Sequence, residues 1–266
     1  MKDIKLSKKG VVLCDLDGVI WLSNQPIPAG SKGVEKLRQG GLDVVFLTNN
    51  SSLTVSSYIE KLKRANIEAT PEQIITSSVI AANYLTKLLP PGAKVAALGA
   101  EGLTEAIVNE GFKLTDETDC QAVVVGWHKD FGFKSITFAM RAIAQGARFI
   151  ATNSDPTLPS PEGPMPGNGS LIASISTACD CVPEVTGKPH MPTVEFIKQR
   201  FGEKGIVVGD RPTTDGALAK ALGWPFALVM SEISHSTEQE RQIASSAAVT
   251  GADLLEISND IIKMMP

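Results

Sequence analysis

The sequence predicts an α/β protein built on a parallel sheet, with a second α/β unit along the same chain. Short β-branched runs alternate with helical stretches almost throughout, which is typical of βαβ units. A second such series begins at Lys94 and could form an independent unit. The length of 266 residues suits either one large domain or two smaller ones, and we expect two.

The expected elements are separated by clear turn signals. Thr70 and Pro71 open a capped turn, and Pro90-Pro91-Gly92 ends the helix before the second series. In the first part we expect strands at residues 10–16, 43–47 and 74–76, and helices at 32–39, 55–65 and 77–89. In the second part we expect strands at 95–98, 122–125 and 148–151, and helices at 102–109, 134–145 and 170–178. Beyond residue 186 we expect strands at 206–208 and 226–229, and helices from about 192, at 216–222 and at 259–264.

One long loop, residues 153–169, is rich in proline. It carries five of the sixteen prolines, which is too many for regular structure and more than a simple connection needs. Because long structured loops often serve binding, we expect this loop to have a functional purpose.

Composition and charge exclude several classes of function. Hydrophobic residues make up 43% of the chain and charged residues 20%, as in an ordinary folded domain. The net charge is −4 with no block of like charges, so we expect no nucleic-acid partner.

Residues 1–9 lack the apolar core of a signal peptide, and no apolar run approaches the roughly 20 residues that a membrane helix needs. The four cysteines show no C-x-x-C spacing, so we expect a cytoplasmic protein with reduced thiols, while Cys179-Asp180-Cys181 leaves a metal or redox site open.

Two aspartates follow the first strand. Asp15 and Asp17 leave it two residues apart, so we expect their side chains to share one face at the carboxyl end of the sheet, where open α/β folds bind ligands. A divalent cation between them would offset their repulsion, and oxygen-only ligands favour magnesium over zinc. Gly18 permits a tight turn and lets backbone N–H groups approach a phosphoryl oxygen. A strand-end pair that only caps a turn is the alternative.

Polar residues also follow the second strand, and a lysine stands at a later bend. Thr48-Asn49-Asn50 could hold phosphoryl oxygens, or could form a polar turn with a helix cap. Lys188, between a glycine and a proline, could bring a positive charge to a phosphate and the nucleophile, or could be a solvated surface lysine.

Acidic residues appear again after the strand of residues 206–208. Asp210 would supply a third carboxylate for the cation, and Asp215 could bind a metal-bound water or orient Lys188. Several strand ends therefore present polar groups that suit a metal and a phosphate. The whole set of motifs is far less probable by chance in one chain than any one of the motifs alone.

The order of these motifs resembles the haloacid dehalogenase (HAD) superfamily of phosphatases. The chain carries D-x-D-G-V from Asp15, T-N-N from Thr48, G-K-P around Lys188 and G-D-R-x-x-T-D from Gly209. The segment between the second and third motifs, with T-N-S-D-P-T-L-P and P-G-N-G-S, resembles the NagD-like (p-nitrophenyl phosphatase, type IIA) branch. The resemblance implies a HAD-like Rossmannoid core with a parallel sheet and an inserted α/β C2-type cap that chooses the leaving group and closes over the site. The implied core is residues 1–78 and 187–266, and the implied cap is residues 79–186.

The resemblance also implies a role for each matched residue. Asp15 would be the nucleophile that forms an aspartyl-phosphate, and Asp17 would be the general acid and then the base for water. Mg²⁺ would be held by Asp15, the Asp17 backbone carbonyl and Asp210. The residues expected to bind the phosphoryl group are Gly18, Thr48, Asn49 and Lys188.

The chain departs from the family pattern at a few positions. Pro212 and Thr213 stand where relatives often have leucine and an acid, and Gly216-Ala217 stands where they often have an aliphatic pair. His128 stands where relatives commonly show aspartate. His128 in the cap and Trp21 near the nucleophile are candidate substrate contacts, although each could equally be a packing residue.

We therefore expect a magnesium-dependent hydrolase of phosphoric monoesters, acting on a small phosphorylated metabolite. Sugar phosphates, glycerol phosphate, phosphoglycolate and nucleotides all remain open as substrates. A phosphotransferase or mutase with the same aspartyl-phosphate is the alternative. A receiver-like signalling module is disfavoured by length, and a nucleotide-binding module at residues 98–102 by the lack of G-x-G-x-x-G spacing. Caps of this type often help to form dimers, so the resemblance leaves a homodimer open.

Overall fold

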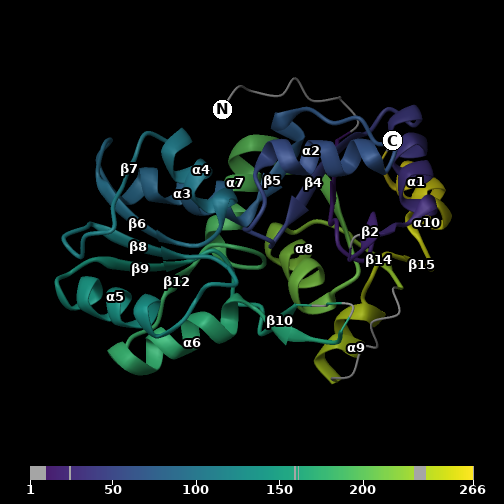
Figure 1. The fold of residues 1–266 in the computed structure, drawn as a ribbon. Helices are drawn as coiled ribbons and strands as arrows, with labels where there is room; N and C mark the ends of the chain where they lie inside the picture. Colours follow the sequence, from purple (N-terminus) through teal and green to yellow (C-terminus); the bar gives the residue numbers. More distant parts are fainter. Residues whose placement is uncertain (1–9, 24, 159, 161, 231–237, 266) are drawn as a thin grey trace. The chain divides into compact units, whose positions relative to one another are not determined.

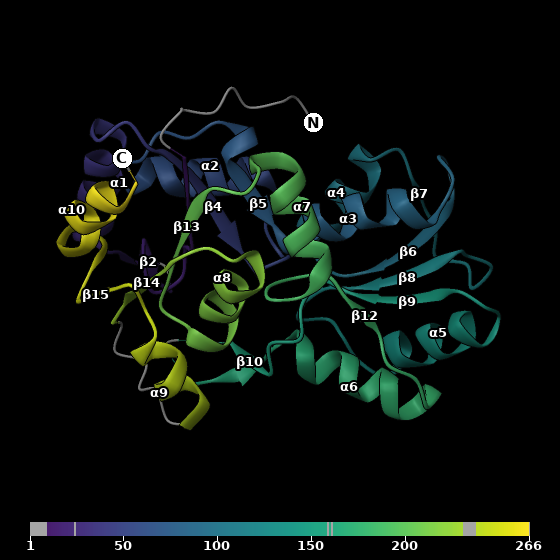
Figure 2. The same ribbon diagram turned by 180° about the vertical axis from the view of Figure 1, so that it is seen from behind.

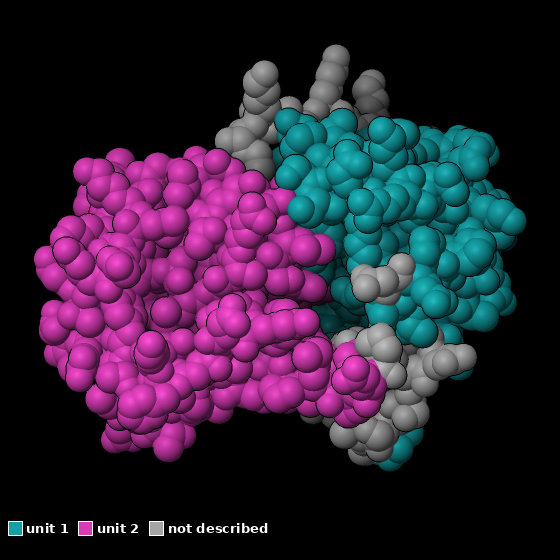
Figure 3. All heavy atoms as spheres, viewed as in Figure 1, with its two compact units in different colours: residues 1–48, 56–75, 193–266 teal, residues 49–55, 76–192 magenta. Residues whose placement is uncertain are grey.

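The structure of the protein is a computed structural model, and its chain divides into two compact units (Figures 1 and 3). It describes residues 10–23, 25–158, 160, 162–230 and 238–265, so the expectation for residues 1–9 lies outside the described residues. The first unit comprises residues 1–48, 56–75 and 193–266, and the second comprises residues 49–55 and 76–192. None of the helices in the described ranges is long and apolar enough to cross a membrane.

The first unit is built on a six-stranded sheet in the order β15-β14-β13-β1-β4-β5. The central pairs are parallel, with Cys14 of β1 in register with Val208 of β13 and Phe46 of β4. These strands are continuous apolar runs because both faces of a parallel sheet are covered. The strands are β1 (Val11–Cys14), β4 (Asp43–Thr48), β5 (Ile74–Thr76), β13 (Gly205–Gly209), β14 (Phe226–Val229) and β15 (Val249–Gly251).

Helices and short elements complete this unit. α1 (Pro28–Gln39) and α10 (Leu254–Met264) lie side by side in both views (Figures 1 and 2). Gly33 makes this packing possible, because a Cβ there would lie 2.6 Å from Cγ of Leu254. A short antiparallel pair, β2 (Trp21–Leu22) and β3 (Gln25–Pro26), follows β1. The remaining elements are α2 (Val55–Arg64), the 3₁₀ turn Pro71–Gln73, α7 (Met191–Phe201), the π-helical turn Pro212–Gly216, α8 (Ala217–Leu222) and α9 (Glu238–Ser245).

The second unit has its own five-stranded sheet in the order β12-β9-β8-β6-β7, and all its pairs are parallel. Its strands are β6 (Lys94–Leu98), β7 (Lys113–Leu114), β8 (Ala122–Val125), β9 (Arg148–Ala151) and β12 (Glu184–Val185). Its helices are α3 (Ser77–Leu88), α4 (Glu101–Asn109), α5 (Phe133–Ala144) and α6 (Asn168–Cys179).

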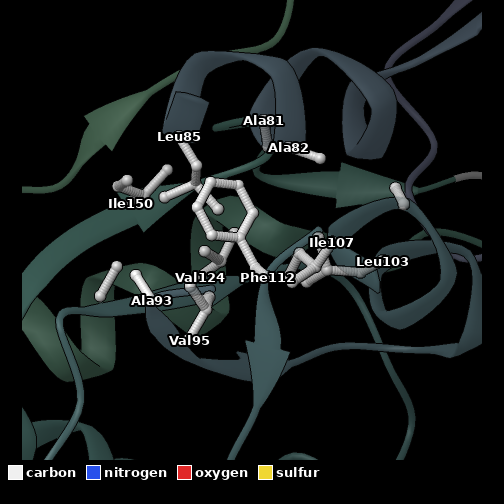
Figure 4. Close-up of a cluster of buried hydrophobic side chains, with 12 residues drawn as sticks. Ala81, Ala82, Leu85, Ala93, Val95, Leu103, Ile107, Phe112, Val124 and Ile150 are labelled. Atoms are coloured by element: carbon white, nitrogen blue, oxygen red, sulfur yellow. The ribbon is translucent and has the colours of Figure 1, made fainter. Parts of the chain in front are cut away.

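Two separate apolar layers stabilise this second sheet. On one face, α3 and α4 cover it, and Figure 4 shows Leu85, Phe112 and Val124 among the buried side chains there. On the other face, α5 and α6 pack against β8 and β9, with Phe149 and Ile175 in the cluster. A unit with apolar layers on both faces of its sheet has the core that an independent domain needs.

The prediction of an α/β protein with parallel sheets is confirmed. The prediction that the proline-rich loop has no regular structure is wrong. A short antiparallel pair, β10 (Thr157–Leu158) and β11 (Met165–Pro166), lies within it. The two-stranded pair tolerates proline because each of its strands has an open edge, where no N–H needs to be donated.

The bounds of the compact units differ from those predicted for a core and a cap. Residues 76–78 and 187–192 and the segment Asn49–Val55 are grouped with the second unit rather than the first. The division into a catalytic core and a cap stays a prediction.

Candidate active site

Three carboxylates meet at the carboxyl edge of the first sheet. Asp15 follows β1 directly, and its N–H donates to Val208 O of β13 at 2.9 Å. Asp210 follows β13, and Asp215 lies on the π-helical turn after it. Each of the three offers one oxygen, and these atoms lie within 4.8 Å of one another. Within the described ranges this is the one group of three or more acidic, histidine or cysteine residues that could hold a metal ion.

Two glycines allow the carboxylates to approach the backbone. Gly18 has a φ of +82°, and a Cβ there would overlap the carboxylate of Asp210. A Cβ at Gly209 would likewise overlap the carboxyl group of Asp215. Only glycine suits both positions, so the D-x-D-G and G-D motifs bring the acids together because these two glycines have no side chain.

The donor set suits a hard divalent cation. Asp210 and Asp215 are almost fully buried and Asp15 is 7% exposed, so three carboxyl groups lie together in a poorly hydrated region. Such a group is costly without a counter-charge, and a cation bound by oxygen alone supplies it. Carboxylate oxygens without histidine or cysteine favour magnesium or calcium over zinc.

The Asp17 carboxyl group has a hydrogen-bond partner of its own. Oδ1 of Asp17 accepts a hydrogen bond from Nε1 of Trp21 at 3.0 Å. β1 ends at Cys14, so the two-residue alternation of a strand does not extend to Asp17, and the chain turns there instead. The turn directs the Asp17 carboxyl to the indole of Trp21. That the Asp15 and Asp17 side chains share one face stays a prediction.

The environment of Asp17 favours its protonated form. Burial raises the pKa of this carboxyl, and the nearby Asp15 charge raises it further. Lys61, the Trp21 hydrogen bond and Arg211 act in the opposite direction and lower the pKa. The net shift is upward, which is the direction that a general acid at neutral pH requires.

Thr48 is the last residue of β4 and lies in the same unit as the carboxylates. It is buried, at the carboxyl end of the strand next to β1. Because parallel strands end at the same edge of a sheet, its hydroxyl belongs to the edge at which Asp15 and Asp210 lie.

Asn49 and Lys188 belong to the second unit, where they contact each other. Oδ1 of Asn49 accepts from the Lys188 N–H at 2.8 Å, and Nδ2 of Asn49 donates to Lys188 O at 3.1 Å and to Asp155 at 3.2 Å. Lys188 is 3% exposed, so the alternative of a solvated surface lysine is wrong. The amide of Asn49 therefore fixes the backbone of Lys188 by two hydrogen bonds.

Two further asparagines, to which the sequence motifs gave no role, form a chain of hydrogen bonds that leads to Asn49. Nδ2 of Asn153 donates to Asn49 O at 2.7 Å, and Nδ2 of Asn168 donates to Asn153 O at 2.8 Å. They are the asparagines of T-N-S-D-P-T-L-P and P-G-N-G-S, two neighbouring motifs that lie far from Asn49 in sequence. Their role could be read only once the fold had placed both loops beside Asn49.

We expect the change Asn49→Ala to destabilise the protein and weaken substrate binding together. It leaves the Lys188 N–H and C=O without their amide partner, which should lower the free energy of unfolding by about 1–3 kcal/mol. Denaturant unfolding and the KM for a phosphate ester measure the two effects. Asn109→Ala is the matched control: Asn109 is the exposed last residue of α4 in the same unit, so KM should stay near wild type. An unchanged KM in Asn49→Ala would contradict the role of this contact.

The two candidate substrate contacts have partners within their own units. His128 lies with Nδ1 3.1 Å from Gly126 O and its ring edge-on to Phe131, at 5.7 Å between centroids. Trp21 is 1% exposed. Contact of either residue with substrate stays a prediction. All four cysteines are free, as expected for reduced thiols, and none joins a group that could hold a metal among the residues described.

Comparison with known protein families matches both parts of the chain. A model described as haloacid dehalogenase-like hydrolase matches residues 12–113, and a HAD-hydrolase-like model matches residues 185–257. The first match contains Asp15 and Asp17, and the second contains Lys188, Asp210 and Asp215.

Relatives and solved structures cover most of the chain. A dihydroxyacetone phosphatase of Corynebacterium glutamicum (strain R) is 34% identical over 232 residues, which are 86% of this chain and 84% of that protein. The structure of a p-nitrophenyl phosphatase from Archaeoglobus fulgidus superposes with a TM-score of 0.86 at 29% identity, over 94% of this chain and 98% of that one. A glycerol phosphate phosphatase from Mycobacterium tuberculosis in complex with magnesium gives a TM-score of 0.84 at 29% identity, over 99% and 80%.

Proposed function

Since the chain belongs to the haloacid dehalogenase-like hydrolases, in their NagD-like (p-nitrophenyl phosphatase) branch, we propose that its chemistry takes place at the Asp15, Asp210 and Asp215 carboxylates. The protein is a magnesium-dependent phosphatase of small phosphomonoesters. The observation that carries the assignment of the site is the convergence of three carboxylates at one edge of the first sheet.

In the proposed first step, a carboxylate oxygen of Asp15 attacks the phosphorus of the ester. The new O–P bond gives an aspartyl-phosphate while the bond from phosphorus to the leaving oxygen breaks. Asp17 gives its proton to that oxygen, which departs as an alcohol. Asp17 is then a carboxylate and is ready for the second step.

In the proposed second step, water attacks the phosphorus of the aspartyl-phosphate. Asp17 takes a proton from the water, and the bond to Asp15 breaks. Inorganic phosphate leaves, Asp15 is again a carboxylate and Asp17 is again protonated. One acid thus serves both steps in opposite directions, and its raised pKa suits the first of them.

Several residues would bind the groups that react. Asp15, Asp210 and the Asp17 backbone carbonyl would hold magnesium, with Asp215 as a further oxygen donor or as a partner for a metal-bound water. Bound magnesium neutralises charge on the phosphoryl group. The residues that we propose to bind the phosphoryl oxygens are Gly18, Thr48 and Lys188, with Asn49 acting through the backbone of Lys188.

We propose a small phosphorylated metabolite as the substrate. The similar proteins are named for dihydroxyacetone, glycerol phosphate and p-nitrophenyl phosphatase activities, which supports a short polyol or sugar phosphate over a nucleotide. A panel of such esters, assayed for phosphate release with and without magnesium, tests this. We expect turnover of glycerol phosphate or dihydroxyacetone phosphate above that of nucleoside monophosphates, and a preference for nucleotides would contradict it.

A phosphotransferase or mutase is the second candidate, because the same aspartyl-phosphate could be passed to an alcohol. The names of the similar proteins favour water as the acceptor. Equal amounts of phosphate and alcohol in the products are expected of a hydrolase. A cytoplasmic location and a homodimer formed through the cap stay predictions.

A further inference from the structure

The indole of Trp21 lies against the carboxyl group of Asp17 because the chain turns sharply between them. The Gly18 N–H donates to Trp21 O at 2.8 Å, and the Ile20 N–H donates to Leu16 O at 2.9 Å. The turn therefore closes on itself and brings residue 21 beside residue 17. At 3.0 Å, Nε1 of Trp21 then donates to Oδ1 of Asp17.

Two residues of α2 contact the Trp21 ring within the same unit. Its ring is stacked on Tyr58 of α2, at 6.3 Å between centroids and 13° between planes. Nζ of Lys61, one turn along α2, lies 4.0 Å from the centroid of the Trp21 ring and donates to Ser23 O at 3.1 Å. A buried ring with an aromatic neighbour and a cation over its face has little freedom to change rotamer.

We propose that Trp21 is a positioning residue for the general acid, because its indole N–H fixes the orientation of the Asp17 carboxyl group. The indole nitrogen can only donate, so the Asp17 oxygen that faces it must accept. A carbonyl oxygen accepts such a bond more strongly than a hydroxyl oxygen does, so the bond to Oδ1 favours Oδ2 as the oxygen that carries the transferable proton. Lys61 and Tyr58 contribute by fixing the indole. The inference rests on the proposed function, in which Asp17 protonates the leaving oxygen.

Comparing esters with a poor and a good leaving group distinguishes a positioning role from a purely structural one. A variant that is only destabilised would lose activity equally on both esters. An alcohol is a poor leaving group and needs the proton from Asp17, whereas p-nitrophenol leaves readily as its anion. Loss of the orientation of the acid should therefore slow the transfer of the phosphoryl group from glycerol phosphate more than from p-nitrophenyl phosphate. The ratio kcat/KM reports this transfer for both esters, even where release of the aspartyl-phosphate limits kcat.

The test compares Trp21→Phe with Asp17→Asn on the two esters. Phenylalanine keeps an aromatic ring beside Tyr58 and Lys61 but has no N–H. For Trp21→Phe we expect kcat/KM for glycerol phosphate to fall by about 10-fold, a part of the roughly 10²–10⁴-fold that general acid catalysis contributes. The fall for p-nitrophenyl phosphate should stay below about threefold. Asp17→Asn should show the same selectivity with a larger amplitude, and thermal unfolding checks that each variant is folded.

Trp224→Phe is the matched control. Trp224 is also buried in the first unit, but its Nε1 has no hydrogen-bond partner among the described residues, so the same change removes no N–H donor that is in use. Its ratio of activities on the two esters should equal that of the wild type. A selective loss in Trp224→Phe equal to that of Trp21→Phe would overturn the inference.

A second pair of variants tests the same idea without changing the indole. Lys61→Met removes the cation over the ring, and Lys61→Arg retains one. Lys61→Met also removes a charge that lowers the pKa of Asp17, so kcat/KM is followed across pH, where loss of that charge alone would only shift the profile. We expect instead a selective loss on glycerol phosphate at the plateau of the profile in Lys61→Met, and its recovery in Lys61→Arg. This pair decides the matter if Trp21→Phe fails to fold.

The outcomes separate the inference from the function on which it depends. A larger loss in kcat/KM on glycerol phosphate than on p-nitrophenyl phosphate, in both Asp17→Asn and Trp21→Phe, supports the positioning role. Selectivity in Asp17→Asn alone, with Trp21→Phe slowing both esters equally or neither, overturns the inference and leaves the general acid in place. Equal losses on both esters in Asp17→Asn overturn the proposed role of Asp17, and the inference with it.

Discussion

Replacing Asp15 with asparagine is expected to abolish magnesium-dependent phosphate release from every ester that the wild-type protein hydrolyses. The amide oxygen is neutral and a far weaker nucleophile than a carboxylate, so the aspartyl-phosphate no longer forms. The loss in kcat should be at least about 10⁴-fold, as for other enzymes that lose a covalent nucleophile. A colorimetric assay of phosphate, with the variant at high concentration, measures it.

The control for this variant is Asp260→Asn on α10. Asp260→Asn is the same Asp-to-Asn change in the same unit, but Asp260 is exposed and forms an ion pair with Lys263 at 2.9 Å. An exposed ion pair contributes little to stability, so Asp260→Asn should keep wild-type kcat and KM. Normal turnover by Asp15→Asn would rule out Asp15 as the nucleophile.

The second large effect is expected for magnesium binding in Asp210→Asn. Asparagine offers a neutral oxygen in place of one of three carboxylates that lie within 4.8 Å of one another. Changes to groups that only support metal ligands cost about 10–100-fold in affinity, so loss of a ligand should cost at least about 100-fold. The magnesium concentration that gives half-maximal activity should rise accordingly.

Thermal unfolding gives the same information without turnover. A metal that binds the folded state alone raises Tm, and the rise grows with its concentration. We expect magnesium to raise the Tm of the wild type and of Asp260→Asn, and to leave Asp210→Asn nearly unchanged at the same concentration. An equal rise in Asp210→Asn would contradict the placement of the metal at this edge of the sheet.

The central strands of both sheets could be predicted from sequence because they are apolar runs, whereas the two-residue edge strands β7 and β12 carry polar residues and were not expected. The strand at residues 122–125 has the predicted bounds, and those at 43–47 and 206–208 are one or two residues longer in the structure. The final helix begins at Leu254 rather than residue 259. The helix Glu238–Ser245 and the strand Val249–Gly251 were not expected, because residues 238–251 contain few large apolar side chains and so show no clear periodicity.

The candidate site could be predicted as a set of residues but not as a set of contacts. The order of motifs indicated Asp15, Asp210 and Asp215, and the structure brings these three together. The partner of Asp17 could not be predicted, because it depends on a turn that begins where β1 ends. The contact of Asn49 with Lys188 joins residues 139 positions apart, and no local pattern predicts such a pair.

Chemical trapping decides most directly whether Asp15 carries the phosphoryl group. In Asp17→Asn the base for the second step is missing, and p-nitrophenyl phosphate needs no acid for the first, so the aspartyl-phosphate should accumulate. Rapid acid quenching, reduction with borohydride and mass spectrometry of the peptides would then find homoserine at position 15, in the presence of both ester and magnesium. An unmodified Asp15 in the quenched protein, or homoserine at another aspartate, would contradict Asp15 as the nucleophile.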